Sequence, residues 1–260
     1  MNIPSRPNTF VVIAACVGVG FAWVAPNAQA YSEADLETLR TTGECTQCDL
    51  SGADLSGIDL APGANLEHAY IEGANLSGAN LGGVNLRYTD LSGANLARAD
   101  LGGAELNYAN LKGAELNGAN LSGANLGDTT LSNAILSNAN LSGATLFYTK
   151  LRGTNLMGAT LNDAIFEYVD MNGADLTSAL VSGVIFLAAD LRGATTSGQL
   201  LIAESPYVCN VAVPTDSPNL DPNRDCDAVP ALLVDRYGED RLTPAAAQQR
   251  VDLAQEIEWD

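Results

Sequence analysis

A large apolar residue recurs at every fifth position of this chain from Leu66 to Leu191. An α-helix buries residues with a period of 3.6 and a β-strand with a period of 2, so neither element explains this spacing. The earlier residues Leu50, Leu55 and Leu60 keep the same interval, which gives 29 large positions, of which 24 are leucine. A period held so strictly indicates an internal-repeat fold, in which each repeat adds one short segment to a continuous core.

A small residue stands two positions before most of the large ones, and 20 of these 29 positions hold alanine. One large and one small residue in every five therefore form the predicted core, and the other three positions face water. On this assignment Leu121→Asp is expected to disrupt the fold and Asn120→Asp to be nearly silent. Glycine is common two positions after the large residue, which predicts a turn with a positive φ, because glycine or asparagine adopts it at little cost.

A second period of twenty residues marks one position of the repeat, where aromatic residues dominate. Four pentapeptides per turn would stack these residues in one column, so the sequence predicts an all-β solenoid with four sides. With neighbouring backbones about 4.8 Å apart, about seven coils would form a rod roughly 35 Å long. The residues at this position are His68, Tyr88, Tyr108, Asp128, Tyr148 and Tyr168.

Several runs of the repeat resemble the pentapeptide-repeat family. They include Ala-Asn-Leu-Ser-Gly at residues 74–78 and Ala-Asn-Leu at residues 94–96 and 124–126. The resemblance covers residues 48–196 and implies a right-handed, four-sided β-helix. It implies little about activity, because a fold alone does not determine function.

The first thirty residues have the pattern of an export signal. Arg6 precedes an apolar run at residues 10–24, and Ala-Gln-Ala at residues 28–30 forms a small-x-small cleavage site. The run is shorter than the ~20 residues of a membrane-spanning helix, so no integral span is expected after cleavage of residues 1–30. The expected compartment is the periplasm or, for a cyanobacterial source, the thylakoid lumen.

The segment before the repeats, residues 31–47, is predicted to form an N-terminal capping helix followed by a CxxC junction. Ser32 is a favourable N-cap, and Leu36 and Leu39 give this short helix an apolar side. The pentapeptide-repeat solenoid is assigned to residues 48–196, since the five-residue period fails after Leu191.

The segment after the repeats, residues 197–260, is predicted to form a disulfide-closed loop and a C-terminal helix. Prolines predict irregular structure to about residue 230. Pro244 is expected to open the helix, which would end at about residue 257. The predicted buried residues of this helix are Val251, Leu253, Ala254 and Ile257.

Four cysteines remain after removal of the signal, and an even number in an exported chain favours disulfides. Cys45 and Cys48 precede the rod, whereas Cys209 and Cys226 follow it, so pairing across the rod is excluded by the Cα separation of about 7 Å that a disulfide allows. The predicted bridges are Cys45–Cys48 and Cys209–Cys226. A redox role for the CxxC pair is a weaker alternative, because it does not open a helix, where thiol pKa values are lowered.

The sequence offers no residue set for catalysis, and no enzyme activity, metal or cofactor is predicted. The single histidine, His68, lacks a second histidine ligand or a paired nucleophile. Alternating Asp and Asn residues at 221–227 are similar to the start of a calcium loop. However, Cys226 and Leu232 stand where that loop needs glycine and glutamate, so a calcium-responsive tail is a weaker alternative.

The chain is strongly acidic, with 31 acidic and 12 basic residues and a formal charge of −19. This surface repels nucleic-acid phosphates and anionic membranes. Charge of this kind mainly serves solubility, with a dedicated cationic partner as the alternative interpretation, and the expected partner of the chain is another protein. The predicted function is a non-enzymatic, exported structural or protein-interaction scaffold that is a monomer or weak dimer. The alternative is an acidic DNA mimic that regulates a DNA-binding enzyme, as the family resemblance allows. The export signal disfavours it, because such an enzyme is cytoplasmic.

The aromatic column is the candidate interaction face. Stacked rings on neighbouring coils stabilise each other by about 0.5 to 1.5 kcal/mol per pair, so stability alone explains the column. Exposed tyrosines are also favoured at protein interfaces, and both interpretations stay open. The candidate residues are Tyr88, Tyr108, Tyr148 and Tyr168, with Phe147 and Arg87 beside them.

Overall fold

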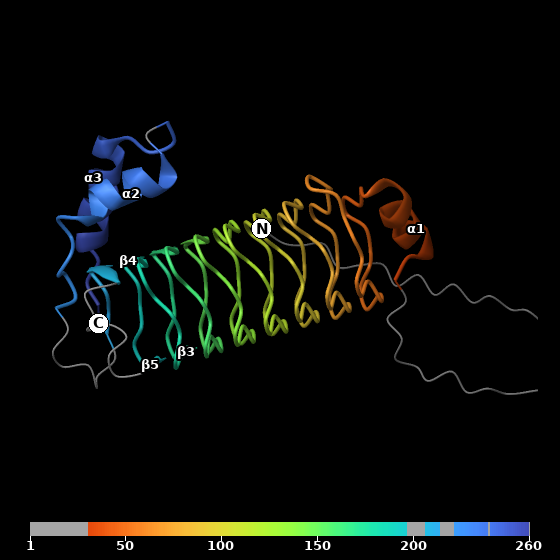
Figure 1. The fold of residues 1–260 in the computed structure, drawn as a ribbon, viewed down its shortest axis with the longest axis horizontal. Coiled ribbons are helices and arrows are strands. Elements are labelled where there is room, and N and C mark those ends of the chain that lie inside the picture. The colour runs from red at the N-terminus through yellow and green to blue at the C-terminus, as the bar shows by residue number, and fades with distance from the viewer. Residues whose placement is uncertain (1–30, 197–205, 214–220, 239, 260) are drawn as a thin grey trace, which may run out of the picture.

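The computed structural model describes residues 31–196, 206–213, 221–238 and 240–259. The predicted signal lies outside these residues. Most of the described chain forms one long solenoid of short parallel β-segments (Figure 1). A helix stands at its N-terminal end and two more stand near its C-terminal end. They are α1 (Glu33–Thr42), α2 (Val229–Tyr237) and α3 (Pro244–Gln255). None of the helices in the described ranges is long and apolar enough to cross a membrane.

From Asn65 to Thr196 each coil of the solenoid closes after twenty residues. Asn85 pairs in parallel with Glu105, Glu105 with Asn125, and Asn125 with Thr145. Four pentapeptides therefore complete one turn, as the aromatic period predicts. The N–H of Leu106 donates to the carbonyl of Asn125 at 2.8 Å, and the same kind of bond joins successive coils along the rod.

The β-bridges lengthen into short strands in the C-terminal coils. One parallel sheet has the order β1-β2-β4-β6, and β3 pairs in parallel with β5 in another. The strands are β1 (Thr145–Phe147), β2 (Ile165–Glu167), β3 (Asp175–Leu176), β4 (Ile185–Leu187), β5 (Thr195–Thr196) and β6 (Tyr207–Cys209).

All 29 large positions are buried, which confirms the predicted core. The small residues, two positions before the large ones, lie beside them. Four of the small positions hold threonine instead of alanine, and an apolar pattern does not predict a hydroxyl there. The Thr129 hydroxyl, for example, donates to the Leu106 carbonyl of the preceding coil at 2.7 Å. The hydroxyls of these four threonines are thus satisfied, as burial requires. The four are Thr89, Thr129, Thr149 and Thr154.

The position two after the large residue has a positive φ along the rod, as predicted. Gly103 (φ 64°) and Gly123 (φ 65°) are typical. Tyrosine also occupies this turn, since Tyr88 (φ 57°) and Tyr108 (φ 63°) adopt the same conformation. The left-handed region costs a residue with a Cβ about 1 to 2 kcal/mol, so another interaction must offset this cost in the aromatic column.

The one irregular interval lies between Leu60 and Leu66, where the spacing of six predicts a local bulge. The structure accommodates it within one coil. Asp59 pairs with Asn80, which is 21 residues ahead, whereas Asn65 pairs with Asn85, which is 20 ahead. The solenoid therefore resumes in register after the extra residue.

Asn and Asp side chains before the large residues form ladders between coils. The Asn120 amide donates to Asp100 at 2.7 Å, and Asn140 donates to Asn120 at 3.2 Å. The oxygen of Asn120 also accepts the N–H of Ser122 at 3.2 Å. These side chains face water as predicted, but they also join coils, so the expectation that Asn120→Asp is nearly silent must be revised.

The predicted N-terminal helix is present as α1. The Ser32 side chain accepts the N–H of Asp35 at 3.2 Å, and Leu36 and Leu39 are buried against the first coil. The coil pattern starts earlier than residue 48, because Glu44 pairs with Asn65 and Cys45 takes the place of a large residue. Cysteine at a core position hides this first repeat from a search for leucines.

The coil pattern also continues beyond residue 196. Strand β6 pairs with β4, and its buried Val208 lies opposite Phe186. Residues 197–205, which the structure does not describe, interrupt the five-residue period in the sequence. The predicted boundary at residue 196 is therefore too early, since the chain adds a further segment to the rod.

The C-terminal helices differ from the prediction in two respects. Helix α2 begins within the segment expected to be irregular, and its Pro230 lies in the first turn, where no N–H is needed. Helix α3 starts at Pro244 as predicted, but Leu253 is 50% exposed. Leu253 follows buried Val251 by two positions, which places it on the opposite side of a helix. Ala254 is buried as predicted, and Ile257 is partly buried.

Candidate functional site

The aromatic residues form stacked rings along one corner of the rod. His68 and Tyr88 lie 4.8 Å apart between ring centroids, and Tyr88 and Tyr108 lie 4.7 Å apart and almost parallel. Tyr148 and Tyr168 stack at 5.0 Å. The structure therefore brings the predicted residues together as a column that points outward.

Asp128 divides this column into two parts. We call His68, Tyr88 and Tyr108 the N-terminal stack, and Tyr148 and Tyr168 the C-terminal stack. The two remaining candidate residues lie beside these stacks. The Arg87 guanidinium is 5.6 Å from the Tyr88 ring centroid, and the Phe147 ring meets Tyr148 edge-on at 4.3 Å.

Helices α2 and α3, here called the helical unit, pack on the flank of the rod that carries β4 (Figure 1). This flank is apolar on the outside of the coil, since Ile165, Ile185 and Leu187 are buried beneath the unit. The Tyr168 hydroxyl donates to the Arg250 carbonyl at 2.9 Å. The helical unit therefore partly covers the C-terminal stack and leaves the N-terminal stack exposed.

Glu167 is a fully buried carboxylate between the rod and the helical unit. Its Oε2 accepts a hydrogen bond from Arg250 at 2.9 Å, and its Oε1 has no hydrogen-bond partner within the described residues. Burial raises the pKa of Glu167, and Arg250 and Tyr237 oppose the shift. Burial likewise raises the pKa of Tyr237 to about 12. The five-residue pattern predicts that Glu167 faces water. The apolar residue Ile165, also at an outward position, is the sequence signal that this surface is covered.

Glu167→Gln is expected to gain stability relative to the wild type as the pH rises above the ordinary carboxyl pKa of 4.5. Because the folded protein holds the Glu167 proton more tightly than the unfolded chain, this group stabilises the fold at low pH and loses that contribution as the pH rises through its raised pKa. Chemical denaturation from pH 4 to 8 measures the difference. Glu115→Gln, at an exposed position, is the control. Parallel pH profiles for Glu167→Gln and the wild type would contradict the assignment.

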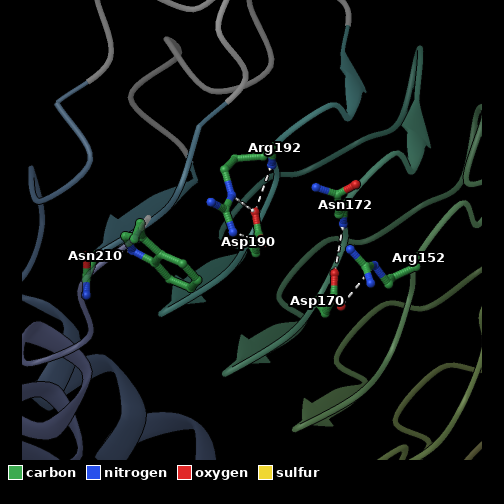
Figure 2. A network of polar contacts seen from close by, with 7 residues as sticks. Arg152, Asp170, Asn172, Asp190, Arg192 and Asn210 are labelled. Atoms are coloured by element: carbon green, nitrogen blue, oxygen red, sulfur yellow. Dashed lines mark hydrogen bonds and ion pairs between the residues drawn. The ribbon is translucent and has the colours of Figure 1, made fainter.

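Polar side chains pair with one another within the last coils of the rod (Figure 2). Arg152 pairs with Asp170 at 3.2 Å, and Arg192 pairs with Asp190 at 2.9 Å. Burial by itself raises the pKa of Asp190, but the hydrogen bonds from Arg192 outweigh it and leave this pKa below its ordinary value.

Both predicted disulfides are formed, Cys45–Cys48 and Cys209–Cys226. The second joins β6 to the segment that leads into α2. The calcium-like segment has a structural role, because Asp225 accepts the N–H of Val208 and Asn223 accepts the N–H of Asn210. In the described part of the chain, no three His, Cys, Asp or Glu residues converge as metal ligands.

A groove of about 590 Å³ runs beside the N-terminal stack. His68, Tyr88 and Tyr108 line one part of it, and Tyr70 and Asp90 from the neighbouring face line another. Tyr88 and Tyr108 are 41% and 48% exposed, although each is held by stacking. This corner therefore presents rigid aromatic surface next to polar groups, which suits binding rather than proton transfer or nucleophilic attack.

The sequence matches the family described as pentapeptide repeats, in eight copies within residues 64–195. Among solved structures, it is similar to HetL, a pentapeptide repeat protein involved in heterocyst differentiation regulation from the cyanobacterium Nostoc sp. strain PCC 7120. The two are 30% identical over 66% of this chain and 85% of HetL, with a TM-score of 0.50.

Two further solved structures are similar over part of the chain. QnrB1, a plasmid-mediated fluoroquinolone resistance protein, is 22% identical over 71% of this chain and 97% of its own, with a TM-score of 0.38. AT2G44920, a pentapeptide repeat protein from the Arabidopsis thaliana thylakoid lumen, is 28% identical over 54% of this chain and 69% of its own, with a TM-score of 0.25. No curated protein matches the sequence.

Proposed function

Because this chain belongs to the pentapeptide-repeat family, whose members fold as right-handed β-helices, we propose that it is a non-enzymatic, exported scaffold that binds a protein partner through the N-terminal stack. The main support is the exposure of Tyr88 and Tyr108 in a conformation that disfavours tyrosine. The similar protein HetL is involved in regulation of heterocyst differentiation, which is consistent with a binding role for this chain rather than with catalysis.

The energetics of the column favour a role beyond stability. Other corners of the rod use glycine at the same turn, for example Gly103 and Gly123. A tyrosine in the left-handed region costs about 1 to 2 kcal/mol, whereas a stacked pair returns about 0.5 to 1.5 kcal/mol. Stacking thus roughly offsets the backbone cost and gives little net stability. Rigid exposed tyrosines are, however, well suited to protein interfaces, because they bury a large area with little loss of entropy.

Export is supported by the signal-like residues 1–30 and by two disulfides, which persist in oxidising compartments. We propose the periplasm or, in a cyanobacterium, the thylakoid lumen. Cell fractionation followed by immunoblotting tests this. Recovery of the mature chain from the cytosol would instead favour the DNA-mimic alternative.

Tyr88→Ser/Tyr108→Ser is expected to abolish capture of the partner while the rod stays folded, because both rings are exposed and serine leaves the core unchanged. Tyr168 is kept, since it anchors the helical unit. Pull-down after crosslinking in the native compartment measures capture, and circular dichroism checks the fold. Ile135→Ser/Leu180→Ser removes two exposed apolar side chains from other faces and serves as the matched control. Unchanged capture by the tyrosine variant would count against the proposed face.

A further inference from the structure

One ring is missing from the aromatic column. Asp128 (φ 55°) holds the position between Tyr108 and Tyr148, and its backbone conformation matches theirs. Two coil steps separate these tyrosines, so their rings lie roughly 9.6 Å apart at about 4.8 Å per step. A planar group at the level of Asp128 would lie about 4.8 Å from both rings, which is the spacing within the column itself.

The two ring faces that border this gap are open. The ring centroid of Phe147 lies 4.3 Å from that of Tyr148 and 5.9 Å from that of Tyr168. The centroids of Tyr148 and Tyr168 lie 5.0 Å apart. These three distances place Phe147 beside the C-terminal stack rather than in line with it, so it does not fill the gap. Tyr108 and Tyr148 are 48% and 49% exposed, compared with 41% for Tyr88, which has a ring on either side.

The gap holds an available carboxylate and opens onto a groove. The Asp128 side chain is exposed and has no hydrogen bond or ion pair within the described residues. A groove of about 290 Å³ lies next to it, and Tyr108 and Asp128 are among the residues that line this groove. Arg250 also lines this groove, where its guanidinium lies 5.7 Å from the Phe147 ring centroid, and its charge is balanced by Glu167 at 2.9 Å.

The same column contains a second short residue, and there the chain supplies its own aromatic group. Ala188 follows Tyr168, and Trp259 lines one groove together with both residues. The Trp259 indole donates to Asn210, the next residue of the column, at 2.9 Å. The Arg192 guanidinium lies 5.9 Å from the Trp259 ring. Beside the short column residue Ala188, the chain thus places the planar ring of Trp259, and the Arg192 guanidinium lies against that ring.

We propose that the gap at Asp128, which we call the Asp128 slot, binds the guanidinium of an arginine side chain on a protein partner. A guanidinium is planar, stacks on aromatic faces and can form two parallel hydrogen bonds with a carboxylate. The ammonium of lysine supplies the positive charge, but it is not planar and does not offer the same pair of parallel hydrogen bonds. The formal charge of −19 further favours a cationic partner. This proposal deepens the proposed function, on which it rests, by naming the group that the column recognises.

Titration of the full chain with the blocked tripeptide acetyl-Gly-Arg-Gly-amide tests the slot, with NMR chemical shifts as the readout. We expect saturable shifts at Asp128, Tyr108 and Tyr148. The lysine tripeptide and the neutral, isosteric citrulline tripeptide are expected to bind about tenfold more weakly, because only arginine combines charge with planar hydrogen bonding. Equal binding of all three peptides, or no saturable shifts with arginine, would overturn the proposal.

Two substitutions separate the charge from the shape of the slot. Asp128→Asn is expected to weaken arginine binding about tenfold, since charged hydrogen bonds are roughly twice as strong as neutral ones. Asp128→Tyr completes the column and is expected to abolish binding. Glu115→Gln and Asn138→Tyr are matched controls, because Glu115 is an exposed acid on another face and Asn138 (φ 57°) holds the same turn position on another corner. Retention of arginine binding by Asp128→Tyr would contradict the assignment.

Partner capture distinguishes this proposal from the proposed function. If capture requires Tyr88 and Tyr108 but survives Asp128→Tyr, the interaction face stands and the slot is wrong. If the arginine peptide binds as expected but the tyrosine variant still captures the partner, the slot stands and the assigned face is wrong.

Discussion

Leu121→Asp is expected to prevent the middle of the rod from folding. Leu121 is fully buried, and burial of a leucine contributes about 1.5 to 3 kcal/mol, which the variant loses. It also places a carboxylate in an apolar shaft, where an unpaired charge costs several kcal/mol more. Together these losses approach the total stability of a typical domain, about 5 to 15 kcal/mol. Thermal denaturation followed by circular dichroism, with limited proteolysis, measures the effect.

Leu180→Asp is the matched control for this variant, because Leu180 is 57% exposed and its substitution introduces the same charge. It is expected to melt within a few degrees of the wild type. Asn120→Asp should fall between the two, since it places a carboxylate against Asp100 in the side-chain ladder, where like charges directly opposite each other are destabilising. Equal melting temperatures for Leu121→Asp and Leu180→Asp would refute the assignment of the core.

Replacement of Cys209 and Cys226 by serine is expected to lower the free energy of unfolding by about 3 kcal/mol, as a closed loop of this length predicts. The bridge ties β6 to the segment that leads into α2, so its loss should release the helical unit from the flank of the rod. Apolar residues beneath the unit would then meet water. Denaturant titration measures the stability loss, and binding of a hydrophobic fluorescent dye reports the uncovered flank.

Replacement of Cys45 and Cys48 by serine provides the comparison. That bridge spans a sequence separation of 3, whereas the C-terminal one spans 17, so its entropic effect is smaller. It also lies at the opposite end of the rod and should leave the dye signal unchanged. A dye signal that rises equally in both variants would show that the C-terminal bridge does not hold the helical unit.

The rod itself is predictable from sequence because every repeat faces the same physical problem. One buried position such as Leu121 predicts the next, and all 29 behave alike. Prediction fails where the period is disguised or interrupted. Cys45 fills a large position without being a leucine, and Val208 rejoins the rod only after residues 197–205. Both residues join the rod through pairing with a distant coil, and the five-residue period of the sequence does not reveal that pairing.

The candidate site is predictable only in part. The spacing of the tyrosines reveals their stacking, but not that the helical unit contacts Tyr168 and so partly covers the C-terminal stack. Ile165 and Leu187 carried a signal, because apolar residues at outward positions indicate a covered flank. Asp128 is visible in the sequence as a member of the column. Its significance depends on the ring faces on either side of it, whose exposure follows from the fold and not from the spacing.

Closure of each coil after four pentapeptides makes the orientation of everything downstream depend on repeat number. Gain or loss of twenty residues would change the length of the rod and keep its faces in phase. A single pentapeptide duplicated upstream of the helical unit would preserve the core and yet rotate that unit by a quarter turn, away from the corner it partly shields. Small changes in gene length could therefore redirect which surface is accessible without altering any residue that forms it.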